Sequence, residues 1–269
     1  MIILKYFSFI FLLLFSCAYN SFALKENVTN ELKNQGFKAL EYNSGQFKLF
    51  TLQKVENLKL PIRIYIEGDG NAYLDKHTPS LDPTPRHNTL IQLIKSDNYP
   101  NIIYLARPCQ YTVDKNCAEK YWTTARFNED VINSMDYVIK KFEAKKLELI
   151  GYSGGAEIAI FLSAKNSNII SLRTIAGNLD HNAFTKQHNL TPLYESLTPS
   201  SSIREISSLP QIHFVGSKDV IINDKIFIAY KAQQLSNSCT KFFKITNATH
   251  AKGWVEQWPE LLKIKAECF

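Results

Sequence analysis

Short apolar runs and amphipathic stretches alternate along most of the chain. From Ile62 to Ile66 every second residue is isoleucine, which is the period of a β-strand. From Phe127 to Phe142 apolar residues recur at helical spacing, which predicts a helix with one continuous apolar side. Strands that alternate with helices of about ten to fifteen residues predict right-handed crossovers and a mostly parallel sheet. Further strands are expected at residues 47–54, 101–105, 146–150, 169–176, 211–215 and 241–245.

Three details of this pattern concern the periphery of the sheet. Residues 47–54 alternate between apolar and polar, which indicates an early strand at the sheet edge. Thr84 and Pro85 predict a helix start, with a capping hydroxyl followed by proline at the first helical position. Residues 177–209 are polar and weakly periodic, and an excursion of this length predicts a lid or a pocket wall.

The loop after the strand at 101–105 is rich in aromatic residues and arginine. It contains Tyr111, Tyr121, Trp122 and Arg126. These side chains either wall a substrate pocket and hold an anionic group, or pack the loop and form surface ion pairs. The sequence leaves both interpretations open.

The most informative stretch is Gly151-Tyr152-Ser153-Gly154-Gly155, which follows an apolar strand and opens a helix. It matches the G-x-S-x-G nucleophile elbow, a strained turn that lifts the serine hydroxyl above the carboxyl ends of the strands. A turn this tight leaves no room for side chains at its flanking glycines. The N–H of Gly154 is expected at the helix N-terminus, where it would stabilise a developing oxyanion. Ser153 is therefore the candidate nucleophile.

Two further candidates follow later strands. Asp219 lies on the turn after the strand at 211–215, and His250 lies on the loop after the strand at 241–245. Because active-site groups gather at the carboxyl ends of parallel strands, both side chains are expected near Ser153. Asp180 also follows a strand and is the rival candidate for the carboxylate that would orient His250.

The strand at 62–66 ends at Glu67-Gly68-Asp69-Gly70, a glycine-punctuated loop that precedes the nucleophile strand. A backbone N–H at Asp69 or Gly70 is the candidate for a second oxyanion donor. A simple turn is the alternative. A carboxylate beside an oxyanion would oppose its charge, so Glu67 and Asp69 are expected to point away or to be paired.

With Ser153, Asp219 and His250 in this order, the sequence resembles the α/β-hydrolase superfamily from about residue 47 to the C-terminus. The resemblance implies a mostly parallel central sheet with helices on both faces, arranged as a three-layer sandwich. It also favours Asp219 over Asp180 as the acid. Residues 65–70 and 107–109 resemble a bacterial branch of exported or lipoprotein-like serine hydrolases of undefined substrate. The residues that carry the superfamily resemblance are Gly151 to Gly155, Gly216 to Asp219, Thr249 and His250.

What the resemblance implies is acyl transfer to water. Ser153 would attack a carbonyl, His250 would move the proton, and Asp219 would orient the imidazole. The chain departs from the family at the oxyanion loop, where many members have His-Gly-Gly-Gly. We expect an exported serine hydrolase that cleaves a small-molecule carboxylic ester, or a thioester or peptide, through an acyl-enzyme. The alternative is a non-catalytic binding protein of the cell envelope that keeps the fold.

No cofactor is expected, because the chain has neither a dinucleotide-binding glycine motif nor a phosphate loop. Asp180, His181 and His188 lie close together, but their spacing does not resemble a metal-ligand set. His213 lies within a strand and is expected to be a core residue with a satisfied hydrogen bond. The net charge of +6 comes from scattered lysines, which does not predict nucleic-acid binding.

Residues 1–23 are expected to be a signal peptide, in which Lys5 precedes an apolar run and Ala23 ends a small-x-small cleavage site. The apolar run is short for a membrane span, so no stable span is expected after cleavage. The residues up to Cys17 also resemble a lipoprotein signal, in which Cys17 would carry a lipid anchor. Residues 24–269 are expected to form a single domain.

Without the leader, the cysteines that remain are even in number, as is typical of an oxidising compartment. Cys109 with Cys117 would close a short loop, and Cys239 with Cys268 would tie the C-terminus to the last strand. Buried free thiols are the alternative. The cysteines and the leader together predict a periplasmic or secreted protein, or an envelope lipoprotein.

Overall fold

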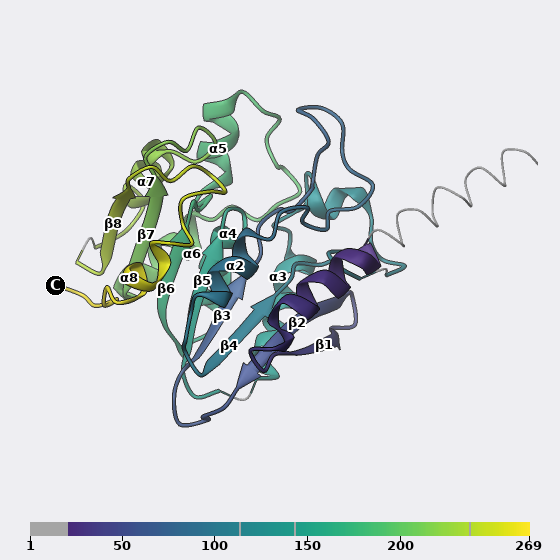
Figure 1. Ribbon diagram of the computed structural model, residues 1–269. Helices are drawn as coiled ribbons and strands as arrows, with labels where there is room; N and C mark the ends of the chain where they lie inside the picture. The colour runs from purple at the N-terminus through teal and green to yellow at the C-terminus, as the bar shows by residue number, and fades with distance from the viewer. Residues whose placement is uncertain (1–20, 113, 143, 237) are drawn as a thin grey trace, which may run out of the picture.

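The computed structural model describes residues 21–112, 114–142, 144–236 and 238–269. In these residues eight strands form one sheet in the order β1-β2-β4-β3-β5-β6-β7-β8 (Figure 1). The strands from β3 to β8 are parallel, whereas β1 and β2 are antiparallel to their neighbours. The strands are β1 (Lys38–Asn43), β2 (Lys48–Val55), β3 (Ile62–Ile66), β4 (Asn101–Leu105), β5 (Leu147–Tyr152), β6 (Ile169–Ile175), β7 (Gln211–Gly216) and β8 (Thr240–Ile245).

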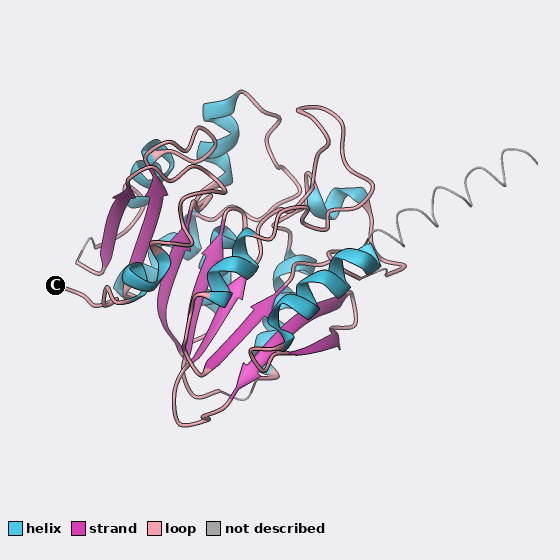
Figure 2. Ribbon diagram, in the orientation of Figure 1, coloured by secondary structure: helices cyan, strands magenta, loops and turns pink. Residues whose placement is uncertain are grey.

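Helices connect the parallel strands and cover both faces of the sheet (Figure 2). The face covered by α3, α4 and α7 and the face covered by α2, α8 and a helix at residues 21–33 each have their own apolar core. The mostly parallel three-layer architecture predicted from the sequence is therefore confirmed. The helices are α2 (Thr89–Lys95), α3 (Glu129–Lys140), α4 (Gly155–Lys165), α5 (His181–His188), α6 (Ser200–Glu205), α7 (Asp224–Lys231) and α8 (Trp258–Leu262), with 3₁₀ turns η1 (Glu119–Trp122) and η2 (Ile206–Ser208).

The two cores follow from the alternation of side chains along the central strands. In β3, Ile64 packs into the core under α3 and α4, while Tyr65 packs into the core under α2 and α8. Successive residues of a strand point to opposite faces, so a strand covered on both sides is buried at nearly every position. The alternating isoleucines predicted the strand correctly, and the buried tyrosine between them reflects the second layer of helices.

The predicted edge strand is wrong, because β2 is not at the edge. β1 pairs with β2 along its whole length and forms the edge of the sheet. Most residues of β1 are exposed, and it includes Lys38 and Glu41. Charged, exposed edge strands are a common means of preventing sheets from pairing with one another. Such a strand has little buried apolar pattern from which to predict it.

The predicted helix start at Thr84 and Pro85 is also wrong. Helix α2 begins at Thr89, with Asn88 at the capping position. The Thr84 hydroxyl instead accepts a hydrogen bond from the backbone N–H of Tyr111, 3.0 Å away. A tertiary contact therefore takes the side chain that would have capped a helix at this point.

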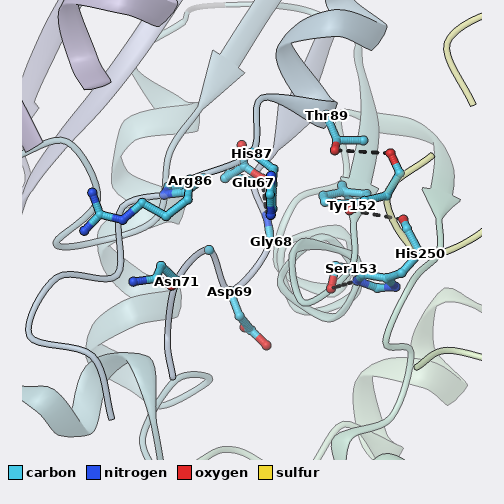
Figure 3. Close-up of a pocket in the computed structure, with 13 residues that line it drawn as sticks. Glu67, Gly68, Asp69, Asn71, Arg86, His87, Thr89, Tyr152, Ser153 and His250 are labelled. Carbon is cyan, nitrogen blue, oxygen red and sulfur yellow. Dashed lines mark hydrogen bonds between the residues drawn. The ribbon is translucent and has the colours of Figure 1, made fainter. Parts of the chain in front are cut away.

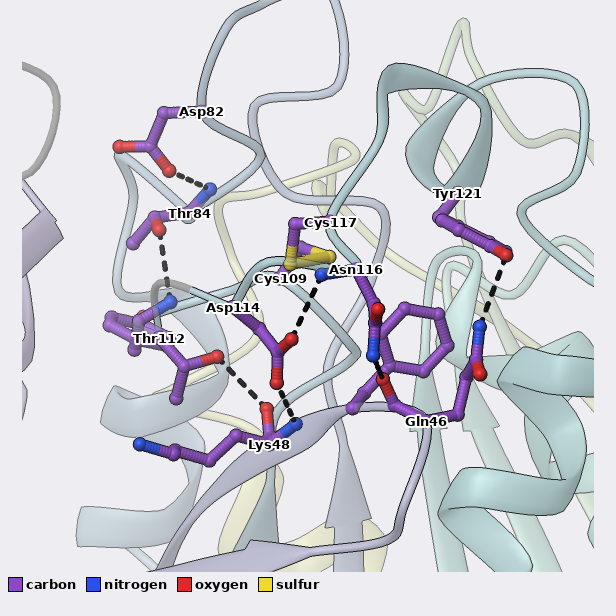
Figure 4. The surroundings of a disulfide bond; sticks show 12 residues. Gln46, Lys48, Asp82, Thr84, Cys109, Thr112, Asp114, Asn116, Cys117 and Tyr121 are labelled. Atoms are coloured by element: carbon purple, nitrogen blue, oxygen red, sulfur yellow. Dashed lines mark hydrogen bonds between the residues drawn. A yellow bond between two sulfur atoms is a disulfide. The ribbon is translucent and has the colours of Figure 1, made fainter. Parts of the chain in front are cut away.

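Both expected disulfides are present, between Cys109 and Cys117 and between Cys239 and Cys268. The first closes a loop that is fastened to the sheet at the start of β2 (Figure 4). Asp114 in this loop accepts a hydrogen bond from the backbone N–H of Lys48 at 3.0 Å. Disulfides persist in oxidising compartments, which agrees with the predicted export.

The predicted signal peptide lies largely outside the described residues, and so does Cys17. The described chain starts in the helix at 21–33, which packs Val28 and Leu32 into the core. Ser21 in this helix donates a hydrogen bond to Asp82 at 2.8 Å. The predicted cleavage position at Ala23 falls within this helix. No helix in the described ranges is long and apolar enough to cross a membrane.

Candidate active site

Ser153 occupies a strained turn between β5 and α4. Its φ is 50°, a left-handed conformation that is uncommon for residues other than glycine. Hydrogen bonds hold the turn, with the Ser153 N–H donating to Ile175 O at 3.1 Å. A β-carbon at Gly151 would lie 2.5 Å from the Cα of Ala156, so the approach of helix to strand requires glycine there. The sequence therefore folds locally as the elbow pattern predicts.

Ser153, His250 and Asp219 form a continuous hydrogen-bonded chain (Figure 3 shows its first two members). His250 Nε2 lies 3.0 Å from Ser153 Oγ, and His250 Nδ1 lies 3.0 Å from Asp219 Oδ2. The Asp219 side chain is fully buried, and its other oxygen accepts the backbone N–H groups of Ile221 and Ile222 at 2.8 and 2.9 Å. The three side chains come from loops after β5, β7 and β8.

Tyr152 supports the loop that carries His250, a contact that sequence reasoning missed. Its hydroxyl donates a hydrogen bond to the backbone carbonyl of His250 at 3.1 Å, and its ring centroid lies 5.6 Å from the imidazole centroid. Burial raises the pKa of Tyr152, so the hydroxyl stays protonated and remains a donor. The variable position beside the nucleophile gave no signal of this role.

Asp180, the rival acid, lies elsewhere. It caps the N-terminus of α5, where one oxygen accepts the backbone N–H groups of Asn182 and Ala183. Its other oxygen accepts a hydrogen bond from Gln233 at 2.7 Å. Its side chain is thus engaged in holding α5, and Asp219 is the carboxylate that contacts His250.

The loop after β3 packs directly against the elbow. A β-carbon at Gly68 would lie 3.1 Å from Ser153 Cβ, so this loop approaches the nucleophile as closely as backbone permits. The N–H of Gly68 donates to the Glu67 carboxylate at 2.8 Å and is therefore not available to a ligand. Within the described parts of the chain, the N–H groups of Asp69, Gly70 and Gly154 donate to no protein group. Gly70 has a φ of 64°, and a β-carbon there would lie 2.1 Å from Pro83 O, so this position requires glycine.

Both carboxylates of this loop are paired. Asp69 contacts Arg107 through Oδ1 and Arg126 through Oδ2, the latter at 2.7 Å. Burial raises the pKa of Asp69, but the two guanidinium groups outweigh burial and leave it below its usual value. Glu67 accepts a hydrogen bond from the Tyr104 hydroxyl at 2.9 Å, and burial raises its pKa to about 7.

A pocket of about 170 Å³ opens beside Ser153 and His250. Its walls come from residues 67–71, 85–87 and 89, and from Tyr152 and Ala251. In Figure 3 the Arg86 side chain points away from Ser153. Within the described chain, no residue of 177–209 lines this pocket, although the Asn178 N–H donates to the Ser153 carbonyl at 2.9 Å, and the lid or pocket wall stays a prediction. That segment folds into α5, α6 and η2.

The loop at 111–126 fits the second interpretation, loop packing with an ion pair, and none of its described residues lines the pocket. Tyr111, Tyr121 and Trp122 are buried and pack the loop, and the Trp122 indole N–H donates to Ser80 O at 2.9 Å. Arg126 reaches the loop after β3 through its ion pair with Asp69. The aromatic residues are thus structural, while the arginine lies next to the candidate site.

Three further histidines, His181, His188 and His213, make their hydrogen bonds away from Ser153. His181 hydrogen-bonds Glu157, a fully buried carboxylate on α4 that the sequence did not single out. His213 lies in the core, 2.8 Å from the Thr174 hydroxyl, as predicted, and burial lowers its pKa to about 3. His188 hydrogen-bonds Ile221 O at 2.8 Å. Among the described residues there is no cluster of three or more side chains suited to a metal.

The strand order, the helices on both faces and the strand-turn-helix around Ser153 define an α/β-hydrolase fold. No family model matches the sequence, and no curated protein does either. Solved structures match in three dimensions across most of the chain.

Est1E from Butyrivibrio proteoclasticus is 13% identical, with a TM-score of 0.59 over 84% of this chain and 96% of that chain. Carboxylesterase CesB from Bacillus subtilis is 11% identical, with a TM-score of 0.59 over 92% of this chain and 95% of that chain. A membrane phospholipase A, described as a bacterial virulence factor, is 14% identical, with a TM-score of 0.59 over 96% and 95%. At these identities the likeness establishes the fold.

Proposed function

We propose that this protein is a serine hydrolase that cleaves a carboxylic ester through Ser153, His250 and Asp219. The observation that carries the proposal is the hydrogen-bonded chain Asp219–His250–Ser153, with both distances at 3.0 Å, on a strained elbow beside an open pocket. Hydrolysis of an ester is supported by the structural neighbours, which include a carboxylesterase and a phospholipase. Thioesters and peptides are variants of the same acyl transfer.

The geometry fits the proton movements that such a reaction requires. With Nδ1 protonated and donating to Asp219, His250 Nε2 is free to accept the proton of the Ser153 hydroxyl. The serine oxygen then bonds to the ester carbonyl carbon, and the carbonyl oxygen becomes the oxyanion. His250 returns the proton to the departing alkoxide as the acyl-enzyme forms. A water molecule repeats the sequence, releasing the acid and restoring Ser153.

The oxyanion in this scheme accepts hydrogen bonds from backbone N–H groups. Gly154 supplies the first, from the residue after the nucleophile, and Asp69 supplies the second, from the loop after β3. Gly70, which follows on the same loop, is the alternative donor, and we assign the role to Asp69 because its side chain lies against Gly154. Each such donor contributes about 3 kcal/mol of transition-state stabilisation in comparable sites.

The proposed setting is an oxidising compartment outside the cytoplasm. The two disulfides support this setting. A leader at residues 1–23, cleaved after Ala23, remains the predicted route of export. A lipid anchor at Cys17 remains the alternative.

The test is covalent labelling of protein that lacks the leader with a fluorophosphonate probe, followed by mass spectrometry of the modified peptide. We expect one adduct on Ser153 and none on the Ser153→Ala variant. Ser163→Ala, on the helix that follows, is a matched control that should label as wild type does. A folded protein without an adduct on Ser153 would contradict the proposal and favour a non-catalytic binding protein.

A further inference from the structure

The side chain of Asp69 sits between two arginines and the nucleophile elbow. We propose that Arg107 and Arg126 use this carboxylate to hold the Asp69 N–H against the elbow, so that Asp69, Arg107 and Arg126 are positioning residues for the oxyanion site. The inference rests on the proposed function and adds to it. It assigns a role to three side chains that take no part in the proton transfers.

The contact between the Asp69 carboxylate and the elbow is direct. A β-carbon at Gly154 would collide with the Asp69 carboxylate and would lie 3.0 Å from Arg107 Nη1. The carboxylate and one guanidinium therefore lie directly over Gly154, the residue whose N–H is the first oxyanion donor. In Figure 3 the Asp69 side chain leaves its loop on the side of Ser153. The two donors come from different segments, and this side chain spans the gap between them.

Hydrogen bonds from Gln110 and Glu67 hold the backbone of the proposed oxyanion loop next to Asp69. Gln110 donates a hydrogen bond to the Gly68 carbonyl at 2.9 Å and accepts one from the Arg107 N–H at 3.0 Å. The Gly68 N–H is occupied by Glu67. These bonds fix the loop around Asp69 but leave the Asp69 N–H itself free. The side chain of Asp69 is thus the contact that ties this residue to the elbow.

Arg107 and Arg126 also make contacts of their own, which restrict the movement of the Asp69 side chain between them. Arg107 donates to the carbonyl of Arg126, and its guanidinium lies 5.2 Å from the centroid of the Phe127 ring. Arg126 donates through Nε to the Thr123 carbonyl at 2.8 Å. The Cys109–Cys117 disulfide closes a loop within the segment that joins the two arginines. A side chain whose partners are fixed in this way loses little entropy when it holds a reacting group.

The charges of the cluster also suit an oxyanion. Within the cluster of Asp69, Arg107 and Arg126, two guanidinium charges outnumber one carboxylate, whereas Asp69 alone would repel the developing negative charge. Glu67 also interacts with Arg107, but burial raises its pKa to about 7 and reduces its negative charge at neutral pH. The guanidinium groups lower the pKa of Asp69 against the effect of burial, so the carboxylate stays ionised at neutral pH. The arrangement explains how a carboxylate is tolerated at this position of the loop.

Asp69→Asn separates positioning from charge. The variant keeps the shape and increases the positive charge of the cluster, so a purely electrostatic role predicts equal or faster reaction. A positioning role predicts slower reaction, because an amide has one acceptor oxygen and cannot satisfy both arginines. Arg126→Gln is the second variant, since Arg126 is the more exposed arginine and Arg107 remains to hold the carboxylate.

The measurements are p-nitrophenyl acetate hydrolysis, the rate of fluorophosphonate labelling, inhibition by phenylboronic acid, and thermal unfolding. For Asp69→Asn we expect kcat to fall about 10- to 100-fold with KM within about twofold, and boronate affinity to weaken by a similar factor. Arg126→Gln should show the same pattern at about fivefold. Asp224→Asn is the matched control and should behave as wild type. Asp224 lies on α7, and the substitution breaks its exposed ion pair with Lys244 of β8.

Unchanged or improved kcat and boronate affinity in Asp69→Asn would overturn the inference while leaving the proposed function intact. If Asp69→Asn does not fold, the same result in Arg126→Gln overturns it. A wild-type protein that neither hydrolyses ester, nor labels, nor binds boronate would overturn both proposals together. The two failures are therefore distinguishable.

Discussion

Two fully buried carboxylates in this protein each hydrogen-bond a histidine ring. Asp219 contacts His250 beside Ser153, and Glu157 contacts His181 on the face covered by α4. Both carboxylate side chains are 0% exposed, so burial of the acid does not distinguish the pairs. The His250 side chain, however, is 20% exposed and the His181 side chain is 2% exposed. The difference therefore lies in what the imidazole can reach.

The surroundings of the two rings explain their different roles. The second nitrogen of His250 faces Ser153 and the pocket. His181 is stacked on Phe127 at 5.4 Å, and its backbone N–H also donates to Glu157 at 2.9 Å. Glu157 thus ties the first turn of α4 to the start of α5. Of the two pairs, Asp219–His250 has a ring that opens onto the candidate nucleophile, whereas Glu157–His181 links α4 to α5.

The largest effect that would test this contrast is on turnover. Asp219→Asn should lower kcat by about 10⁴-fold, because the amide no longer favours the productive tautomer of His250 or stabilises its positive charge. Ester hydrolysis and thermal unfolding together measure this effect, and the melting temperature should change little. Glu129→Gln, at an exposed position of α3, controls for substitution of an acid to its amide. Unchanged kcat in Asp219→Asn would remove Asp219 from the proposed triad.

The second effect is on stability: here the free energy of unfolding should fall while kcat is retained. Glu157→Gln should lower the free energy of unfolding by about 2 kcal/mol, because one amide oxygen replaces two carboxylate oxygens that accept from His181. Its kcat should stay within about twofold of wild type. Urea unfolding and ester hydrolysis measure the two quantities on the same samples. A loss of kcat as large as that of Asp219→Asn would show that both pairs serve the reaction.

The third effect concerns His213, a buried histidine that contacts a hydroxyl and an amide rather than a carboxylate. Burial lowers its pKa to about 3 in the folded protein, whereas an unfolded histidine titrates near 6.5. Between these pH values the unfolded state binds one more proton than the folded state. The contribution of His213 to the free energy of unfolding is therefore complete well above pH 6.5 and is lost as the pH decreases. From pH 6.5 to 5.5 the expected loss is about 1 kcal/mol.

Urea unfolding at several pH values measures this loss. The His213→Gln variant should be less stable overall, and its stability should lack this one-proton decrease on acidification. His77→Gln, which removes an exposed histidine, should keep the wild-type slope. An equal slope in His213→Gln and wild type would show that His213 is not neutral in the folded core.

Elements with strong local signals could be predicted from the sequence. β3 has alternating isoleucines, and the elbow around Ser153 combines a strand pattern, small residues and a helix start. β1 could not be predicted, because its residues are mostly exposed and its place depends on pairing with β2. The helix start at Thr84 was mispredicted because Tyr111, far along the chain, takes the capping hydroxyl.

In the candidate site, too, some residues could be predicted from the sequence and others only from the structure. Sequence pattern alone indicated Ser153, Asp219 and His250, since each follows a strand and parallel strands end at one edge of the sheet. It also pointed to a carboxylate that needed pairing on the loop after β3. It contained no sign that Asp69 meets Arg107 and Arg126, or that Glu157 meets His181, because those partners lie on separate segments.

By itself, the sequence determined where strands, turns and helices alternate, the nucleophile elbow, and the order of the candidate catalytic residues. These depend on side-chain periodicity and on backbone conformations set by neighbouring residues. Only the tertiary structure decided that Asp219 rather than Asp180 contacts His250, that no described residue of 177–209 lines the pocket, and that two arginines hold Asp69. Such contacts join residues tens of positions apart, and their formation depends on how the layers pack around the sheet rather than on local propensity.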